Sequence, residues 1–367
     1  YYCANNFKCD YQFNAPFTAW DEVSSSVSFR DAPKDKPFFY VWNTLITHES
    51  RIWERSNEPL TVDPDEVIIP DYFPDIPEVR MDIARKYSNI EAMDKKVGEL
   101  ISQLESDGLL EKTIIMFWSD HGGNLLRQKR AVGNSGLHVP LIVRYPGKLN
   151  AGTVENRIVS LMDLGPTVLS LLGIKPPDFY DGIPFAGKFD GPKRKYAFGT
   201  ADRFDESTDM QRSVIDGRYV YIKNFMPNLP LIYRNKYRER ITMNAKLIEM
   251  DYNNELKGDA SYIFMKSKPN EEFYDLKYDP YEVNNLILDS KYSVLIDEFR
   301  NALVIFQEEI NDQGFIPENQ LVQSFWPDFI QPITKNVIFN VNESGLLELT
   351  CDTKGASIGY QVGKNIG

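Results

Sequence analysis

Two short hydrophobic runs mark the part of the chain that carries most information. Residues 113–118 (TIIMFW) and 139–145 (VPLIVRY) are rich in β-branched and aromatic residues. This composition is typical of buried strands, and we expect residues 113–118 to form a strand of a parallel sheet. Residues 37–41 (PFFYV) predict a further buried strand. Ligands of open α/β sheets bind beyond the carboxyl ends of the strands, so the residues that follow these runs are candidates for a site.

A long amphipathic helix is predicted between the runs at 37–41 and 113–118. Hydrophobic residues recur at three- and four-residue spacing from Val79 to Leu104, which indicates one buried face. Pro77 suits the first helical turn, and Gly108 suits the residue just past the end of a helix. We expect this helix to pack on the sheet and to join the two strands as a right-handed βαβ unit.

The length of 367 residues suggests about two domains, and the second half of the chain shows shorter segments. A stretch rich in Pro, Gly and Asp places a boundary near residue 190. Strands are expected at 196–200, 211–215 and 218–224, and Asp216-Gly217 between the last two predicts a hairpin turn. Residues 201–212 are expected to be a loop between strands. Two further strands are expected within residues 336–359, around a turn at 342–345.

Charge and cysteine content exclude some classes of function. The net charge is −12, from 41 Lys and Arg against 53 Asp and Glu, which argues against a nucleic-acid partner. The basic runs at 193–195 and 234–240 are short and mixed, and we interpret them as solvated surface. No hydrophobic run has the length that a bilayer span needs. The three cysteines (Cys3, Cys9 and Cys351) form no disulfide framework or metal motif, and the pattern leaves open whether Cys3 and Cys9 pair or stay free.

Chemically useful side chains follow two of the predicted strands. Asp120 and His121 come directly after residues 113–118, and Lys129 lies eight residues further on. Asp120 offers carboxylate oxygens, His121 an imidazole, and Lys129 a cation that could meet an anionic group. His48 follows the strand at 37–41, on the same ligand-binding edge. The chain has three histidines, and the third, His138, is interpreted as structural or as a neighbour of the site residues.

This pattern resembles the sulfatases of the alkaline phosphatase superfamily. In that family a strand ends in Ser-Asp-His-Gly or Ser-Asp-Asn-Gly, and a lysine follows ten residues before a Val-Pro pair. Residues 119–122, Lys129 and Val139-Pro140 keep this pattern. The resemblance implies that Asp120 and His121 bind one divalent cation, usually calcium, and that Lys129 holds the sulfate. It also implies that His48 acts as a catalytic acid near the leaving-group oxygen.

The resemblance extends over most of the chain and implies its fold. Residues 162–174 resemble a packing helix of the family, and residues 272–286 (EFYDLKYDPYEVNNL) resemble the phrase that precedes its last helix, here expected at 292–312. The implied fold class is α/β: an alkaline-phosphatase-like mixed or parallel sheet sandwiched by helices, with a smaller C-terminal antiparallel α+β subdomain. The expected division is 1–190 for the α/β domain, 191–315 for the antiparallel subdomain and 316–367 for a β extension.

The nucleophile of the family is not found in this sequence. Sulfatases use formylglycine, made from the first residue of a Cys/Ser-x-Pro-x-Arg motif, and no such motif occurs here. The paired aspartates and the Lys-x-x-His phrase that accompany it are also absent. We expect these parts in an N-terminal segment that precedes this chain and acts as its partner, so that this chain alone does not catalyse. The resemblance implies a periplasmic, secreted or lysosomal location, which the N-terminus itself does not reveal.

The predicted function is that of the later part of a metal-dependent sulfatase acting on a sulfated carbohydrate, such as a glycosaminoglycan sugar. O-sulfate and N-sulfate both remain open. Arg203, on the expected loop, is a candidate for reading sugar hydroxyls or carboxylates, although solvated loop charge explains it equally well. One alternative is a phosphodiesterase or phosphonate monoester hydrolase of the same superfamily, which usually needs more histidine ligands. The other is a non-catalytic binding protein on the same scaffold.

Overall fold

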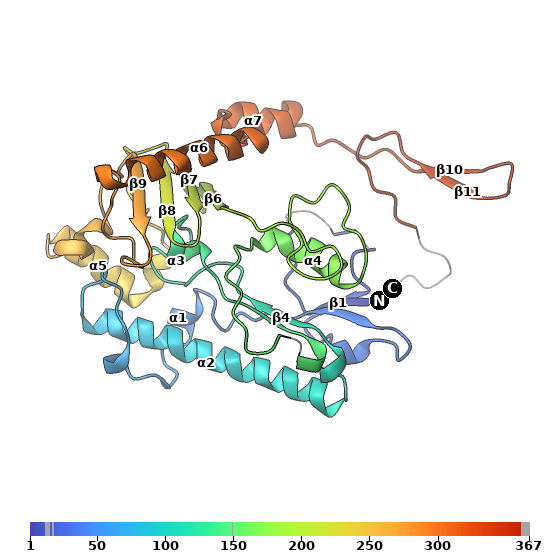
Figure 1. The fold of residues 1–367 in the computed structure, drawn as a ribbon, viewed down its shortest axis with the longest axis horizontal. Coiled ribbons are helices and arrows are strands. Elements are labelled where there is room, and N and C mark those ends of the chain that lie inside the picture. Colours follow the sequence, from blue (N-terminus) through green and yellow to red (C-terminus); the bar gives the residue numbers. More distant parts are fainter. Residues whose placement is uncertain (12–14, 17, 149, 361–367) are drawn as a thin grey trace. The chain divides into compact units, whose positions relative to one another are not determined.

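The computed structural model describes residues 1–11, 15–16, 18–148 and 150–360 (Figure 1). These residues divide into two compact units. One unit is formed by the described residues of Tyr1–Leu45 and Phe315–Gly367, and the other by those of Ile46–Gly314. All candidate site residues lie in the second unit. The domain boundaries predicted from composition remain predictions. Among the described residues, no helix combines the length and the hydrophobicity needed to cross a bilayer.

The first unit contains a parallel sheet and a separate hairpin. The strands β1 (Tyr2–Asn5), β2 (Glu22–Val23) and β3 (Phe38–Val41) pair in the order β2-β1-β3. The prediction of a strand at 37–41 is confirmed, whereas β1 and β2 were not predicted from their polar surroundings. β10 (Ile338–Val341) and β11 (Leu347–Thr350) form the expected C-terminal hairpin. The short helix α7 (Glu318–Phe325) precedes it, and all three cysteines are free.

The long helix α2 (Pro77–Ser106) has the predicted ends. Pro77 occupies the first turn, and Gly108 follows the cap with a positive φ of 69°, a conformation that glycine adopts at little cost. The predicted buried face is only partly correct. Val79, Ile83 and Leu104 are buried, but other members of the face, Tyr87 and Ile90 among them, are more exposed. The first turns of α2 join a core with residues from α1 (Arg51–Glu54), α5 (Thr242–Tyr252) and the loops between them.

The prediction that residues 113–118 form a buried strand of a parallel sheet is wrong in its pairing. β4 (Ile115–Trp118) pairs antiparallel with β5 (Leu141–Arg144), and Trp118 is 39% exposed. The connection between the strands explains this pairing. Residues 119–140 leave the end of β4 and enter β5 beside it, because Trp118 lies opposite Leu141. A connection that joins neighbouring strands at the same end makes them antiparallel. The loop that carries the candidate residues is therefore the long connection of a hairpin.

A four-stranded antiparallel sheet with a helix across one face forms the C-terminal part of the second unit (Figure 1). Its order is β6-β7-β8-β9, and side chains of α6 pack on it, with Phe299 against Phe273 at 5.5 Å between ring centres. The expected turn at Asp216-Gly217 joins β7 and β8, and Asp216 Oδ1 accepts from two backbone amides there. The bounds are β6 Ala197–Phe204, β7 Ser207–Ile215, β8 Tyr219–Asn224, β9 Glu271–Asp275, α6 Ser293–Glu309, and, before the sheet, α3 Asn134–Leu137 and α4 Leu164–Leu171.

Candidate active site

The connection from β4 to β5 folds back on itself, and this holds the candidate residues in place. Gly122 N donates to Gly136 O at 2.8 Å, which ties the start of the connection to α3. A Cβ added at Gly122 would lie 1.9 Å from the Ser135 carbonyl oxygen. The glycine is therefore required by the close approach of protein backbone. The space beside Gly122 and Gly123 is filled by the chain itself, so neither glycine leaves room for a substrate.

Asp120 and His121 present an oxygen and a nitrogen close to each other. His121 Nδ1 lies 2.8 Å from the Gly122 carbonyl oxygen. Because a carbonyl only accepts, Nδ1 carries the proton, and the lone pair of the neutral ring is on Nε2. Asp120 Oδ1 lies 3.8 Å from that Nε2, and the Asp120 side chain is 64% exposed. A histidine whose other nitrogen donates to a carbonyl is a typical metal ligand.

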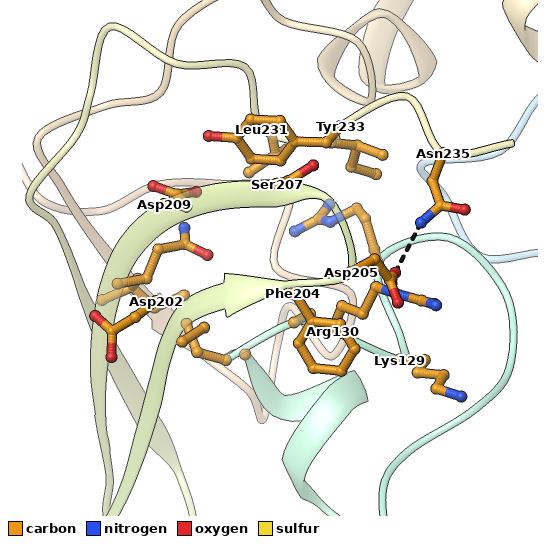
Figure 2. A pocket seen from close by; sticks show the side chains of 18 of the residues that line it. Lys129, Arg130, Asp202, Phe204, Asp205, Ser207, Asp209, Leu231, Tyr233 and Asn235 are labelled. Atoms are coloured by element: carbon orange, nitrogen blue, oxygen red, sulfur yellow. Dashed lines mark hydrogen bonds and ion pairs between the residues drawn. The ribbon is translucent and has the colours of Figure 1, made fainter. Parts of the chain in front are cut away.

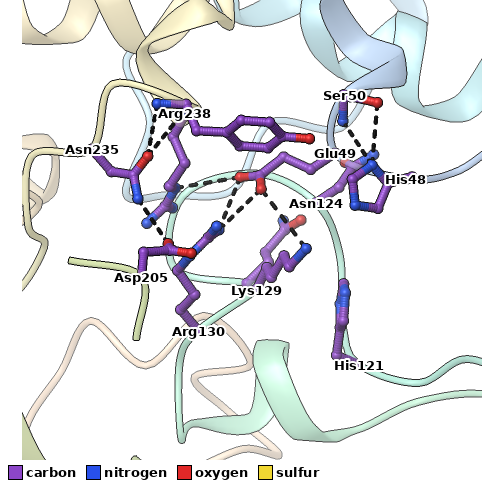
Figure 3. Close-up of polar contacts among 12 residues, drawn as sticks. His48, Glu49, Ser50, His121, Asn124, Lys129, Arg130, Asp205, Asn235 and Arg238 are labelled. Carbon is purple, nitrogen blue, oxygen red and sulfur yellow. Dashed lines mark hydrogen bonds and ion pairs between the residues drawn. The ribbon is translucent and has the colours of Figure 1, made fainter. Parts of the chain in front are cut away.

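His48 has the opposite tautomer. Its Nδ1 accepts from the backbone amide of Ser50 at 3.3 Å and lies 3.2 Å from Ser50 Oγ (Figure 3). The proton of the neutral ring is therefore on Nε2, where it can be donated. The two predicted histidines thus present different chemistry: Nε2 of His48 is a donor and Nε2 of His121 is an acceptor.

Two contacts connect the His48 segment to the Lys129 segment. Asn124 Nδ2 donates to the Thr47 carbonyl oxygen at 3.0 Å, and Glu49 Oε2 lies 3.8 Å from Lys129 Nζ. Glu49 is 1% exposed, and both of its oxygens accept from Arg130 Nη1 at 3.0 Å. The structure therefore brings His48 and Lys129 into one region through the residues beside them.

Lys129 is a largely buried cation, and the charged groups around it affect its pKa. Burial lowers its pKa, while the carboxylates of Glu49, Asp120 and Asp205 oppose that effect and Arg130 adds to it. Asp120 is thus close enough to Lys129 to affect its pKa, although less than Glu49 does.

Arg238 enters this cluster from a distant part of the sequence. It is 7% exposed, and its Nε lies 3.5 Å from Glu49 Oε1 (Figure 3). Burial and the nearby Arg130 lower the pKa of Arg238 to about 10. Asp205 completes the cluster, because it accepts from Arg130 Nε at 2.6 Å and from Asn235 Nδ2 at 2.7 Å. Glu49 is therefore surrounded by three cations: Lys129, Arg130 and Arg238.

The described residues supply only part of a binding site for a divalent cation. Asp120 supplies the oxygen that calcium prefers, and His121 supplies a correctly oriented nitrogen. Within residues 1–11, 15–16, 18–148 and 150–360, however, no three His, Cys, Asp or Glu side chains gather closely enough to hold a metal. Asp120 and His121 thus fit as two members of a larger ligand set.

The prediction that residues 201–212 form a loop is wrong. These residues form the second half of β6 and the first six residues of β7, joined by a tight turn at Asp205 and Glu206. Arg203 is exposed on β6, and its role as a substrate contact stays a prediction. Arg212 is 1% exposed, and its guanidinium binds Asp202 at 2.9 Å and Asp312 at 2.7 Å, so it stabilises the sheet.

The end of this hairpin lines a pocket of about 110 Å³ beside Lys129 (Figure 2). Phe204 and Asp205 come from the turn, Arg130 from the β4–β5 connection, and Tyr233 and Asn235 from the segment after β8. The ring of Phe204 lies 5.1 Å from the Arg130 guanidinium. The sequence alone did not indicate this pocket or the roles of Glu49, Asn124 and Arg238. The only available signal was that Glu49 directly follows His48.

Comparisons with known proteins identify the family of this chain. Residues 18–174 match the sulfatase family. An ulvan-active sulfatase of Formosa agariphila is 37% identical over 99% of this chain and 67% of its own length. The human N-sulphoglucosamine sulphohydrolase is 26% identical over 69% of this chain and 53% of its own length. The crystal structure of a putative sulfatase from Bacteroides fragilis covers 77% of this chain and 56% of its own, with a TM-score of 0.53 and 19% identity, and so supports the fold. The chain spans about two thirds of the first relative and about half of the second.

Proposed function

Because the chain belongs to the sulfatase family, we propose that it forms part of an enzyme that removes sulfate from a sulfated carbohydrate, such as a glycosaminoglycan sugar. The observation that carries this proposal is the arrangement of two histidines of opposite tautomer and one largely buried lysine, on segments that contacts of Glu49 and Asn124 connect. The two relatives act, by their names, on ulvan and on N-sulphoglucosamine, which supports a sugar substrate.

Each residue has a role in this mechanism. Lys129 binds the sulfate oxygens and neutralises their charge, an interaction that is strong because its side chain is only 15% exposed. His48 acts in its imidazolium form, in which Nδ1 can donate to Ser50 Oγ; it gives the proton of Nε2 to the leaving oxygen of the sugar and is left neutral. Asp120 and His121 would hold a calcium ion together with ligands from elsewhere, and that ion would act as a Lewis acid on the sulfate. In this proposal the nucleophile is a formylglycine, for which these 367 residues hold no Cys/Ser-x-Pro-x-Arg motif.

The proposed function is tested by measuring the release of sulfate from sulfated sugars by the complete protein. Lys129→Ala removes a charge-assisted hydrogen bond worth about 1.5–3 kcal/mol, so kcat/KM should fall roughly 10- to 150-fold, with both rate and binding affected. The control is Lys96→Ala, since Lys96 is 51% exposed on α2 and pairs only with Glu99 among the described contacts. Equal activity of Lys129→Ala and Lys96→Ala would remove Lys129 from the sulfate site.

His48→Ala should act mainly on substrates with poor leaving groups. A sugar alcohol needs a proton as it leaves, so its sulfate should react about 10²- to 10⁴-fold more slowly, whereas an aryl sulfate such as 4-nitrophenyl sulfate should be affected little. Equal losses on both substrates would remove His48 from the acid role. Faster hydrolysis of phosphonate monoesters than of sulfate esters by the unchanged protein would overturn the proposed function itself.

A further inference from the structure

The pocket beside Lys129 has an unequal balance of hydrogen-bond donors and acceptors. Its five carboxylates already have partners. Asp205 binds Arg130 and Asn235, and Asp209 accepts from Lys268 Nζ at 2.7 Å. Asp202 accepts from Arg212, and Glu282 accepts from the backbone amide of Asn134. The fifth carboxylate, Glu272, accepts from Asn224, Tyr262 and Tyr274. The acceptor side of the pocket is therefore satisfied within the chain.

The donor side is not satisfied. Arg238 Nε and Nη2, Arg127 Nη1 and Tyr233 Oη are buried and have no hydrogen-bond partner among the described residues. All three side chains line the pocket, and only 7% of Arg238 is exposed. The long ion pair of Arg238 Nε with Glu49 does not meet hydrogen-bond geometry. A buried donor without a partner costs about 1–3 kcal/mol, so several of them in one pocket call for an acceptor from outside the chain.

We propose that this pocket binds a second anionic group of the sugar substrate, a carboxylate or a further sulfate, next to the sulfate that Lys129 holds. The proposal rests on the proposed function and specifies its substrate. Carboxylates and sulfates bring acceptor oxygens without donors, which is what the spare donors require. A sugar hydroxyl would bring a donor of its own into a pocket whose carboxylates are already partnered. Arg238 is the principal contact, since it is the most buried of the residues with unpaired donors.

Matched substrates and variants test this subsite in the complete protein. We would compare N-acetylglucosamine 6-sulfate with two probes that add an anion: N-sulphoglucosamine 6-sulfate and a monosulfated disaccharide that contains glucuronate. The unchanged protein should favour at least one doubly charged probe by about 10- to 100-fold in kcat/KM, the value of one charge-assisted hydrogen bond. The probe that is favoured identifies the group as sulfate or carboxylate.

Arg238→Gln should abolish that preference, so that kcat/KM for the doubly charged probe falls to about the value for the singly charged substrate. Tyr233→Phe removes one hydroxyl without changing shape, so it should reduce the preference several-fold even if Arg238→Gln folds poorly. The control is Arg234→Gln, on the same segment but 62% exposed and paired with Glu239. A preference absent from the unchanged protein, or equal losses on all substrates, would overturn the subsite and indicate that water alone fills the pocket.

Calorimetric titration separates this subsite from the proposed function. If the unchanged protein releases no sulfate from any probe, the proposed function fails, but affinity for the doubly charged sugars is still measurable. Weaker binding to Arg238→Gln than to Arg234→Gln would support the subsite in that case. Equal affinity of both variants would reject it.

Discussion

Glu49→Gln removes one negative charge from the centre of three cations. The buried carboxylate lies 3.0 Å from Arg130 Nη1, 3.5 Å from Arg238 Nε and 3.8 Å from Lys129 Nζ. At an effective dielectric constant of about 20, the Lys129–Glu49 attraction alone is about 4 kcal/mol. Much of that attraction offsets the cost of burying charge, but removing one partner of a buried ion pair typically costs about 3–5 kcal/mol. We expect the free energy of unfolding to fall by this amount.

Urea unfolding followed by circular dichroism measures this loss. The control is Glu54→Gln, five residues further on in α1. Glu54 pairs with Arg51 at 2.6 Å, but their side chains are 41% and 36% exposed, so its loss should cost less than about 1 kcal/mol. A loss for Glu49→Gln that does not exceed that of Glu54→Gln would refute the reasoning. Combining Glu49→Gln with Arg130→Met should cost less than the sum of the two single changes, because both remove members of one cluster.

The same substitution should change the activity of the complete protein at high pH. Burial lowers the pKa of Lys129, and Glu49 is the first of the carboxylates that oppose this. Without Glu49 the pKa of Lys129 should fall further, and Lys129 should lose its proton at a lower pH. The alkaline limb of the kcat/KM profile should therefore move to lower pH in Glu49→Gln and stay in place in Glu54→Gln. An unmoved limb would show that Glu49 does not sustain the charge of Lys129.

Two further predictions concern the buried carboxyl group of Glu282 and the proposed calcium ligand Asp120. Burial raises the pKa of Glu282 to about 7, so the folded protein keeps a proton that the unfolded chain loses above about pH 4.5. Stability should therefore decline between about pH 4.5 and 7, by up to about 3 kcal/mol, and Glu282→Gln should flatten that decline in urea unfolding; an unchanged profile would contradict it. Asp120→Asn should weaken calcium binding by the complete protein at least about tenfold in calorimetry. The exposed Asp94→Asn is the control, and equal affinities would exclude Asp120 as a ligand.

The features that the sequence predicted are those encoded by neighbouring residues. The ends of α2 follow from Pro77 and Gly108, whose backbone preferences act within one turn. The β7–β8 hairpin follows from Asp216-Gly217. The positions of His48 and Asp120 after their strands could also be predicted, since a strand end is a local event. The pairing of β4 could not, because a hydrophobic run of four to six residues does not specify its partner or that partner's direction.

The basic run at 234–240 shows why the cluster around Glu49 escaped prediction. We interpreted the run as solvated surface, and this holds for Arg234, which is 62% exposed and paired with Glu239. It fails for Arg238, which is 7% exposed. The two arginines have the same chemistry and lie four residues apart, but Arg238 faces a carboxylate 189 positions earlier in the chain. A buried charge is tolerated only where an opposite charge meets it, so the burial of Arg238 depends on Glu49 and not on the residues beside it. The same dependence makes Glu49→Gln the most direct test of the cluster, because one neutral substitution leaves three cations from two distant segments facing one another.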